Sequence, residues 1–140
     1  MGFWLPDKCV SYYSPVPEET TDEHIFYYEA LCVLSAIHDV TETLCAPPTS
    51  KILIYTDNNN TVAIFNTLQC LPHYNLILTN AANICMMTNI HLRVLHIPGE
   101  LNTVADAISQ NNFALAQNYV PDLIISPFLP PQLLLGAPKK

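Results

Sequence analysis

The sequence predicts one α/β domain in which helices cover a sheet. Short β-favouring apolar runs alternate with segments of helical periodicity along most of the chain. A chain of 140 residues can bury one real core and is too short for two domains of ordinary size. No window reaches the ~18 to 20 uninterrupted apolar residues of a membrane span. We therefore expect a soluble protein that has no membrane-spanning segment.

The charge balance is acidic, with 5 Lys and Arg against 12 Asp and Glu and a formal charge of −7. Proteins that bind nucleic acid usually carry a basic face, because neutralising phosphates supplies much of the affinity. We therefore expect this chain by itself to hold nucleic acid weakly.

The cysteines and the opening residues favour an intracellular protein, cytoplasmic or nuclear. The start, "MGFWLPDKC", lacks the basic region and apolar run of a secretory signal. The five cysteines are odd in number and form no C-x-x-C pair, which is typical of reduced core residues rather than disulfides or a zinc site. They are Cys9, Cys32, Cys45, Cys70 and Cys85.

The first half of the chain predicts two strands, a helix and a third strand. "GFWLPDKCVSYYSPV" is β-favouring and broken at Pro6-Asp7, so it indicates two short strands joined by a turn. Apolar residues at helical spacing predict a helix from about Glu23 to Val40. The prolines of "CAPPTS" end it, and "KILIYT" after them has the pattern of a buried strand.

The second half predicts three helices, a strand and a tail. "DNNNTVAIFNTL" indicates a cap and a short helix, and Asn75 to Thr88 another helix. "IHLRVLHI" predicts a buried strand, and a helix from Asn102 to Gln110 follows the Pro98-Gly99 turn. Residues 113–140, rich in proline and leucine, are expected to be a linker or extended strap outside a domain of residues 1–112.

Three carboxylates occupy special places in this order of elements. Glu29 lies on or beside the packing face of the first helix, unless it reaches water at the edge of that face. Asp57 directly follows a buried strand, where ligand sites of α/β sheets concentrate, although it could instead cap the next helix. Asp106 lies in the last helix between two alanines, which allow that helix to approach the sheet closely.

Converging carboxylates suit hard divalent cations such as Mg²⁺ or Mn²⁺. Two such ions about 3.5 to 4 Å apart can activate water and stabilise the leaving oxygen when a phosphodiester is cleaved. The three acids therefore predict metal-assisted hydrolysis.

Three segments resemble the ribonuclease H (RNase H) domain of retroelement reverse transcriptases, most closely those of DIRS-type elements that use a tyrosine recombinase. They are "FYYEALCVLSAI", "IYTDNNNTVAIFN" and "HIPGELNTVADAISQ", and the last is the most specific. The resemblance covers roughly residues 2 to 112. It implies an RNase H-like mixed sheet flanked by helices, and hydrolysis of the RNA strand of RNA–DNA hybrids.

The resemblance implies that Glu29, Asp57 and Asp106 are catalytic metal ligands for Mg²⁺ or Mn²⁺. His96 stands where retroelement versions commonly have a histidine or tyrosine before Pro-Gly, so it is a further catalytic candidate. A packing role for His96 at the end of its strand is equally open. The implied partners are an RNA–DNA hybrid and the polymerase domain of a parent polyprotein.

The match fails at the first, central strand of the family's sheet, which carries its first aspartate. The sequence begins at the second strand with "GFW", and Asp7 lies in the following turn, so no residue takes that role. We expect two strand edges to be left unpaired. The apolar segment around Leu123 to Ile125, or a neighbouring copy in a homodimer, could fill the place. Activity is expected to be weak or absent, and a non-catalytic scaffold or protein-interaction module is the alternative.

Overall fold

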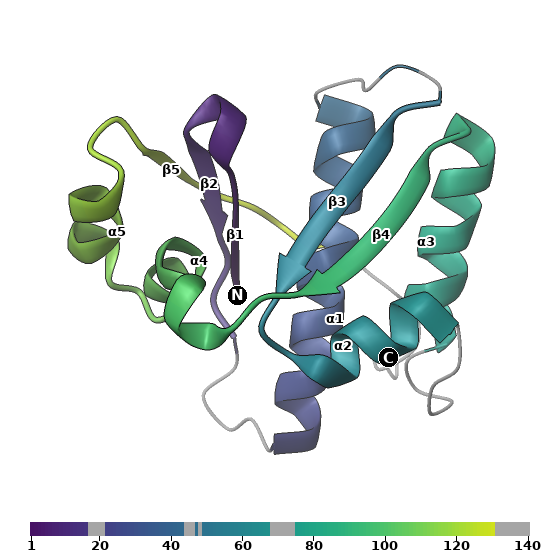
Figure 1. The fold of residues 1–140 in the computed structure, drawn as a ribbon, viewed down its shortest axis with the longest axis horizontal. Coiled ribbons are helices and arrows are strands. Elements are labelled where there is room, and N and C mark those ends of the chain that lie inside the picture. Colours follow the sequence, from purple (N-terminus) through teal and green to yellow (C-terminus); the bar gives the residue numbers. More distant parts are fainter. Residues whose placement is uncertain (17–21, 44–46, 48, 68–74, 131–140) are drawn as a thin grey trace.

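The computed structural model describes residues 1–16, 22–43, 47, 49–67 and 75–130 and shows a mixed α/β protein (Figure 1). The strands are β1 (Gly2–Leu5), β2 (Val10–Tyr13), β3 (Lys51–Thr56), β4 (His91–His96) and β5 (Ile124–Pro127). The helices are α1 (Asp22–His38), α2 (Asn59–Thr67), α3 (Asn75–Thr88), α4 (Thr103–Ser109) and α5 (Phe113–Tyr119). Shorter helical turns are η1 (Pro6–Lys8), η2 (Asp39–Thr43) and η4 (Gly99–Leu101). None of the described helices is long and apolar enough to cross a membrane.

The strands form two separate sheets in the part of the chain that the structure describes. β1 pairs with β2 in the antiparallel direction through the tight turn at η1, and β2 pairs with β5 in parallel. β3 and β4 form a second, parallel pair in register from Lys51↔His91 to Thr56↔His96. A parallel pair needs a long crossover, which the helices α2 and α3 provide here.

The long helix α1 lies behind β3 and forms the centre of the core (Figure 1). Leu34 and Ile37 on α1 are fully buried, as are Ile77 on α3 and Val94 on β4. The helix ends in a π-helical turn, η2, at the point where the sequence predicted its end near Val40. Burial of these side chains contributes about 1.5 to 3 kcal/mol each to folding.

A second apolar cluster joins the last helices to the first sheet. Val104, Ala107 and Ile108 on α4 pack with Ala116 on α5 and with Leu123 before β5. α4 lies so close to β1 that a Cβ atom on Gly2 would lie 2.6 Å from Ile108 Cγ2. The absence of a side chain at Gly2 is therefore what allows α4 to cover β1.

Residues 113–130 differ from the expected linker or strap. They form α5 and β5, and Leu123 and Ala116 are buried in the second cluster. The prediction that the segment around Leu123 to Ile125 fills the missing strand's place is wrong, because β5 pairs with β2 on the side away from β3. Residues 131–140 of the expected tail lie outside the described residues.

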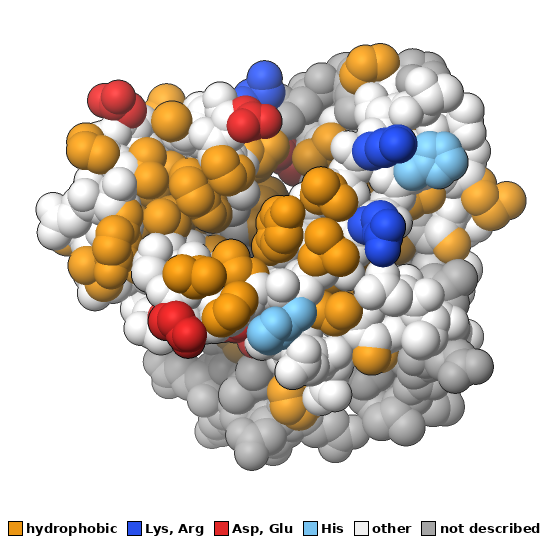
Figure 2. Space-filling model, viewed as in Figure 1, with side chains coloured by type: hydrophobic (Ala, Val, Ile, Leu, Met, Phe, Trp, Pro, Cys, Tyr) orange, Lys and Arg blue, Asp and Glu red, His pale blue; other side chains and the backbone are white. Residues whose placement is uncertain are grey.

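β1 and β3 face each other across the line that divides the two sheets (Figure 1). No described strand lies between them, and neither pairs with the other. The prediction of two unpaired strand edges is therefore confirmed for the described part of the chain. Leu53 and Tyr55 on β3 are also more than half exposed, and Figure 2 shows apolar side chains gathered on this face.

Candidate functional site

Glu29 and Asp57 lie close enough to interact electrostatically. Glu29 comes from α1 and is half-buried, whereas Asp57 follows the carboxyl end of β3 and is exposed. Burial raises the pKa of Glu29, and the negative charge of Asp57 raises it further. A half-buried carboxylate near a second negative charge favours a bound proton or cation.

Asn58 directly follows Asp57 in the chain and interacts with Glu29. Its side-chain oxygen accepts a hydrogen bond of 3.0 Å from the Thr61 amide and so caps α2. Its side chain also hydrogen-bonds the Glu29 carboxylate, which partly offsets the rise in the pKa of that group. Because Asn58 fills the capping position, Asp57 does not act as the N-cap, which leaves its carboxylate available for a ligand.

The amino group of Met1 is a positive charge that acts on Glu29. It donates a 2.9 Å hydrogen bond to the Ser14 carbonyl at the start of the first sheet. Its charge lowers the pKa of Glu29, against the larger effect of burial. Burial in turn lowers the pKa of the Met1 amine, and the Cys32 and Glu29 side chains oppose that change. The carboxylate pair is thus partly neutralised by the chain itself.

The Pro98-Gly99 turn brings the backbone close to Asp57. A Cβ atom on Gly99 would lie 3.6 Å from Asp57 Oδ2, an ordinary contact distance. η4 and then α4 follow this turn, so the chain passes from the Asp57 carboxylate to the helix that carries Asp106. The "HIPG" segment therefore lies at the same end of the β3–β4 sheet as Asp57.

Asp106 and His96 are exposed near this end of the molecule. Both oxygens of Asp106 accept hydrogen bonds from Gln110 Nε2, at 3.2 and 3.3 Å. His96 is the last residue of β4 and is in register with Thr56, the residue before Asp57. These positions follow the predicted elements, and the catalytic roles of both residues stay predictions.

The residues present do not form the predicted set of metal ligands. Among the described residues, no three His, Cys, Asp or Glu side chains are grouped so that they could hold a metal ion. Asp57 acts electrostatically on Glu29, whereas the Asp106 carboxylate accepts hydrogen bonds from Gln110. A two-ion site needs more oxygen ligands than one carboxylate pair supplies.

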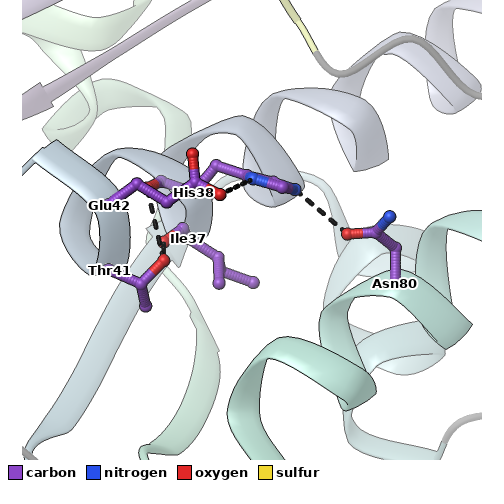
Figure 3. A network of polar contacts seen from close by, with 5 residues as sticks. All are labelled: Ile37, His38, Thr41, Glu42 and Asn80. Carbon is purple, nitrogen blue, oxygen red and sulfur yellow. Dashed lines mark hydrogen bonds and ion pairs between the residues drawn. The ribbon is translucent and has the colours of Figure 1, made fainter. Parts of the chain in front are cut away.

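Sequence reasoning missed a second polar cluster, at the far end of α1 (Figure 3). His38 Nδ1 lies 3.2 Å from Glu42 Oε1, and His38 Nε2 lies 3.0 Å from Asn80 Oδ1 on α3. The (i, i+4) spacing of His38 and Glu42 could have suggested the first contact, whereas Asn80 is distant in sequence. This cluster holds α1 against α3.

An open pocket of about 450 Å³ lies beside this cluster and away from the acids. Tyr12 there hydrogen-bonds Asp39, and burial, together with the Asp39 charge, raises the pKa of Tyr12. The pocket is lined by Phe3, Tyr12, Ser35, His38, Asp39, Glu42, Phe128 and Leu129. None of the four predicted site residues lines it.

Comparison of the chain with family models, with curated proteins and with solved structures finds no match. The class that the geometry itself defines is a mixed α/β protein with a carboxylate pair at the carboxyl end of a parallel strand pair.

Proposed function

We propose that the chain is an RNase H-like domain derived from a retroelement reverse transcriptase, with an incomplete metal site. Its reaction would be the hydrolysis of the RNA strand of RNA–DNA hybrids with Mg²⁺ or Mn²⁺, and in this chain that activity is weak or absent. The partners under this proposal are the hybrid and the polymerase domain of a parent polyprotein. The location is intracellular, cytoplasmic or nuclear.

The observation that carries the proposal is the electrostatic interaction between Glu29 and Asp57. Glu29 lies in the long helix α1, and Asp57 directly follows the parallel strand β3. Asp57 is also close to the Pro98-Gly99 turn. These are the elements on which the resemblance places its acids. The gap between β1 and β3 also falls where the resemblance lacks a strand.

Weak activity follows from what the site lacks. A half-buried Glu29 carboxylate and one neighbouring acid make a poor metal site unless further oxygen ligands join them. The acidic chain also offers little positive charge to hold phosphates. An attached polymerase domain would supply the positive charge that holds the phosphates of the hybrid.

Cleavage of a labelled RNA–DNA hybrid in Mg²⁺ and in Mn²⁺ tests the proposal, with Asp57→Asn as the matched variant. The expected result is a metal-dependent product that is near the detection limit for the native chain and below it for Asp57→Asn. An activity that is strong, or equal in both proteins, would contradict the proposed site.

The alternative is a non-catalytic RNase H-fold scaffold or protein-interaction module. The exposed apolar residues Leu53 and Tyr55 beside an unpaired strand edge favour it, because such surfaces commonly bind partners. No product above that of Asp57→Asn, in either metal, would favour the scaffold over the nuclease.

A further inference from the structure

The edge of β1 that faces β3 pairs with no other strand among the described residues. Met1 and Ser14 exchange both of their backbone hydrogen bonds, at 2.9 and 3.0 Å, which fixes the alternation along the β1–β2 pair. Phe3 and Leu5 therefore bond to β2, and Gly2 and Trp4 point their N–H and C=O groups away from it. The Gly2 carbonyl accepts a weak 3.4 Å bond from Cys32 Sγ.

The edge of β3 that faces β1 has the same property. The Ser50 and Thr56 carbonyls accept bonds from the His91 and Ile97 amides on the β4 side. By the alternation of a strand, residues 50, 52, 54 and 56 bond to β4. The N–H and C=O groups of Lys51, Leu53 and Tyr55 therefore point away from β4 and toward β1.

We infer that the space between β1 and β3 is a strand acceptor for an extended segment of another polypeptide. Figure 1 shows β1 and β3 running in opposite directions, so an inserted strand is parallel to one and antiparallel to the other. A strand antiparallel to β1 and parallel to β3 would continue the pairing that each strand already has with β2 and β4. It would satisfy the backbone groups of both edges and join the two sheets into one. The inference depends on the backbone edges and holds whether or not the chain cleaves hybrids.

The surroundings define the chemistry of that segment. One face of an inserted strand would meet the apolar layer of α1, and the other would lie beside Trp4, which packs in the second cluster, and the exposed Leu53. Apolar β-branched residues therefore fit both faces. The outward N–H and C=O groups of Lys51, Leu53 and Tyr55 are spread over five consecutive positions of β3. An inserted strand of about five residues would match them. The carboxyl end of β3 leads to Asp57 and Glu29, so a basic residue fits that end of the segment.

A second folded copy is a poor occupant of this space. An edge strand of a copy brings its own sheet neighbours and helices, which would collide with β1 or β3 on either side of the acceptor. A homodimer through unpaired edges would instead use the outer edge of β4 or β5. The acceptor therefore suits a segment that is extended and has both edges free.

Amide hydrogen exchange on the full chain, with and without the synthetic peptide acetyl-TVVIVR-amide, tests the inference. The expected result is a slowing of about tenfold or more at the amides of Gly2, Trp4, Lys51, Leu53 and Tyr55. Amides that already bond within the sheets, such as those of Phe3 and Ile54, should change much less. The same peptide with N-methyl groups at alternate residues should have no effect, because it cannot donate to both edges.

Several outcomes would overturn the inference. The N-methylated peptide could bind as tightly as the unmodified peptide. Alternatively, amide exchange could stay unchanged with every peptide. Protection that rises with protein concentration alone would identify a second copy as the occupant. Protection that is present without peptide, and lost when the chain ends at Pro130, would identify the chain's own last residues. Equally tight binding of acetyl-TVVIVE-amide would contradict the basic end.

Discussion

At the scale of single residues, the candidate site depends on the pairing of Glu29 with Asp57. The sequence predicted the position of Asp57 after a buried strand, since that follows from local pattern. It left open whether Asp57 caps the next helix, and the structure assigns the cap to Asn58. The charge of the Met1 amine near Glu29 could not be predicted, because it depends on how β1 packs on α1.

Glu29 makes stability depend on pH. Its pKa is raised in the folded protein, so the folded chain keeps a proton that the unfolded chain has released. The free energy of unfolding therefore falls as pH rises through that range, and the destabilisation persists at neutral pH. Glu29→Gln should raise Tm at pH 7 by about 2 °C or more and change little near pH 3. Gln keeps an acceptor for Asn58.

Thermal unfolding at the two pH values, followed by circular dichroism, checks this effect. Asp122→Asn is the control, because Asp122 is an exposed acid away from the pair. The explanation fails if Glu29→Gln lowers Tm at pH 7, or if the control variant shows the same increase.

Gly2 tests the close packing of α4 on β1. A Cβ atom there would lie 2.6 Å from Ile108 Cγ2 and 3.1 Å from the Ser109 nitrogen, and the latter is backbone that cannot move aside cheaply. Gly2→Ala should therefore cost about 1 to 3 kcal/mol of unfolding free energy in urea denaturation. Gly99→Ala is the matched control, because its Cβ would lie no closer than 3.6 Å to another residue. Equal losses in both variants would argue against the packing explanation.

At the scale of elements, the sequence predicted best where the pattern is long or strongly apolar. "KILIYT" forms β3 over Lys51–Thr56, and the helix predicted from Asn75 to Thr88 has those bounds. The prediction failed after residue 112. α5 has only seven residues and one that is buried, so contacts with α4 rather than its own periodicity determine it.

Leu123 tests whether this last region belongs to the fold. Its side chain is 4% exposed in the cluster with α4 and α5. Leu123→Ala should lower the unfolding free energy by about 2 to 5 kcal/mol, the usual cost of such a cavity. Leu129→Ala, at a position 81% exposed, should cost much less in the same urea titration. A small loss at Leu123 would support the original expectation of a loose strap.

His38 tests how α1 is held to α3. His38→Ala removes the contacts with Glu42 and Asn80 at once. The expected loss of unfolding free energy is about 1 to 2 kcal/mol, because each hydrogen bond contributes modestly. Asn80→Ala should produce part of that loss, and the double variant should lose little more than His38→Ala. Strictly additive losses would show that the two residues do not interact.

At the scale of the whole molecule, the sheet is divided between β1 and β3 within the described residues. The sequence predicted this division only through the resemblance, since nothing in local periodicity reveals which strand edges face each other. The same division separates the first sheet from the carboxylate pair at the end of β3. Under the proposed function, the strand that the described residues lack between β1 and β3 is also the one that would bring a further acid to Glu29 and Asp57.

The most direct test of this explanation is hybrid cleavage by a chain extended at its N-terminus with one strand that carries an aspartate. The account predicts Mn²⁺-dependent cleavage that exceeds that of the native chain. It also predicts that this gain is lost when the added aspartate is changed to asparagine or when Asp57→Asn is introduced. An extended chain that folds, as judged by amide protection of Lys51, Leu53 and Tyr55, and yet cleaves no more than the native chain would contradict the account.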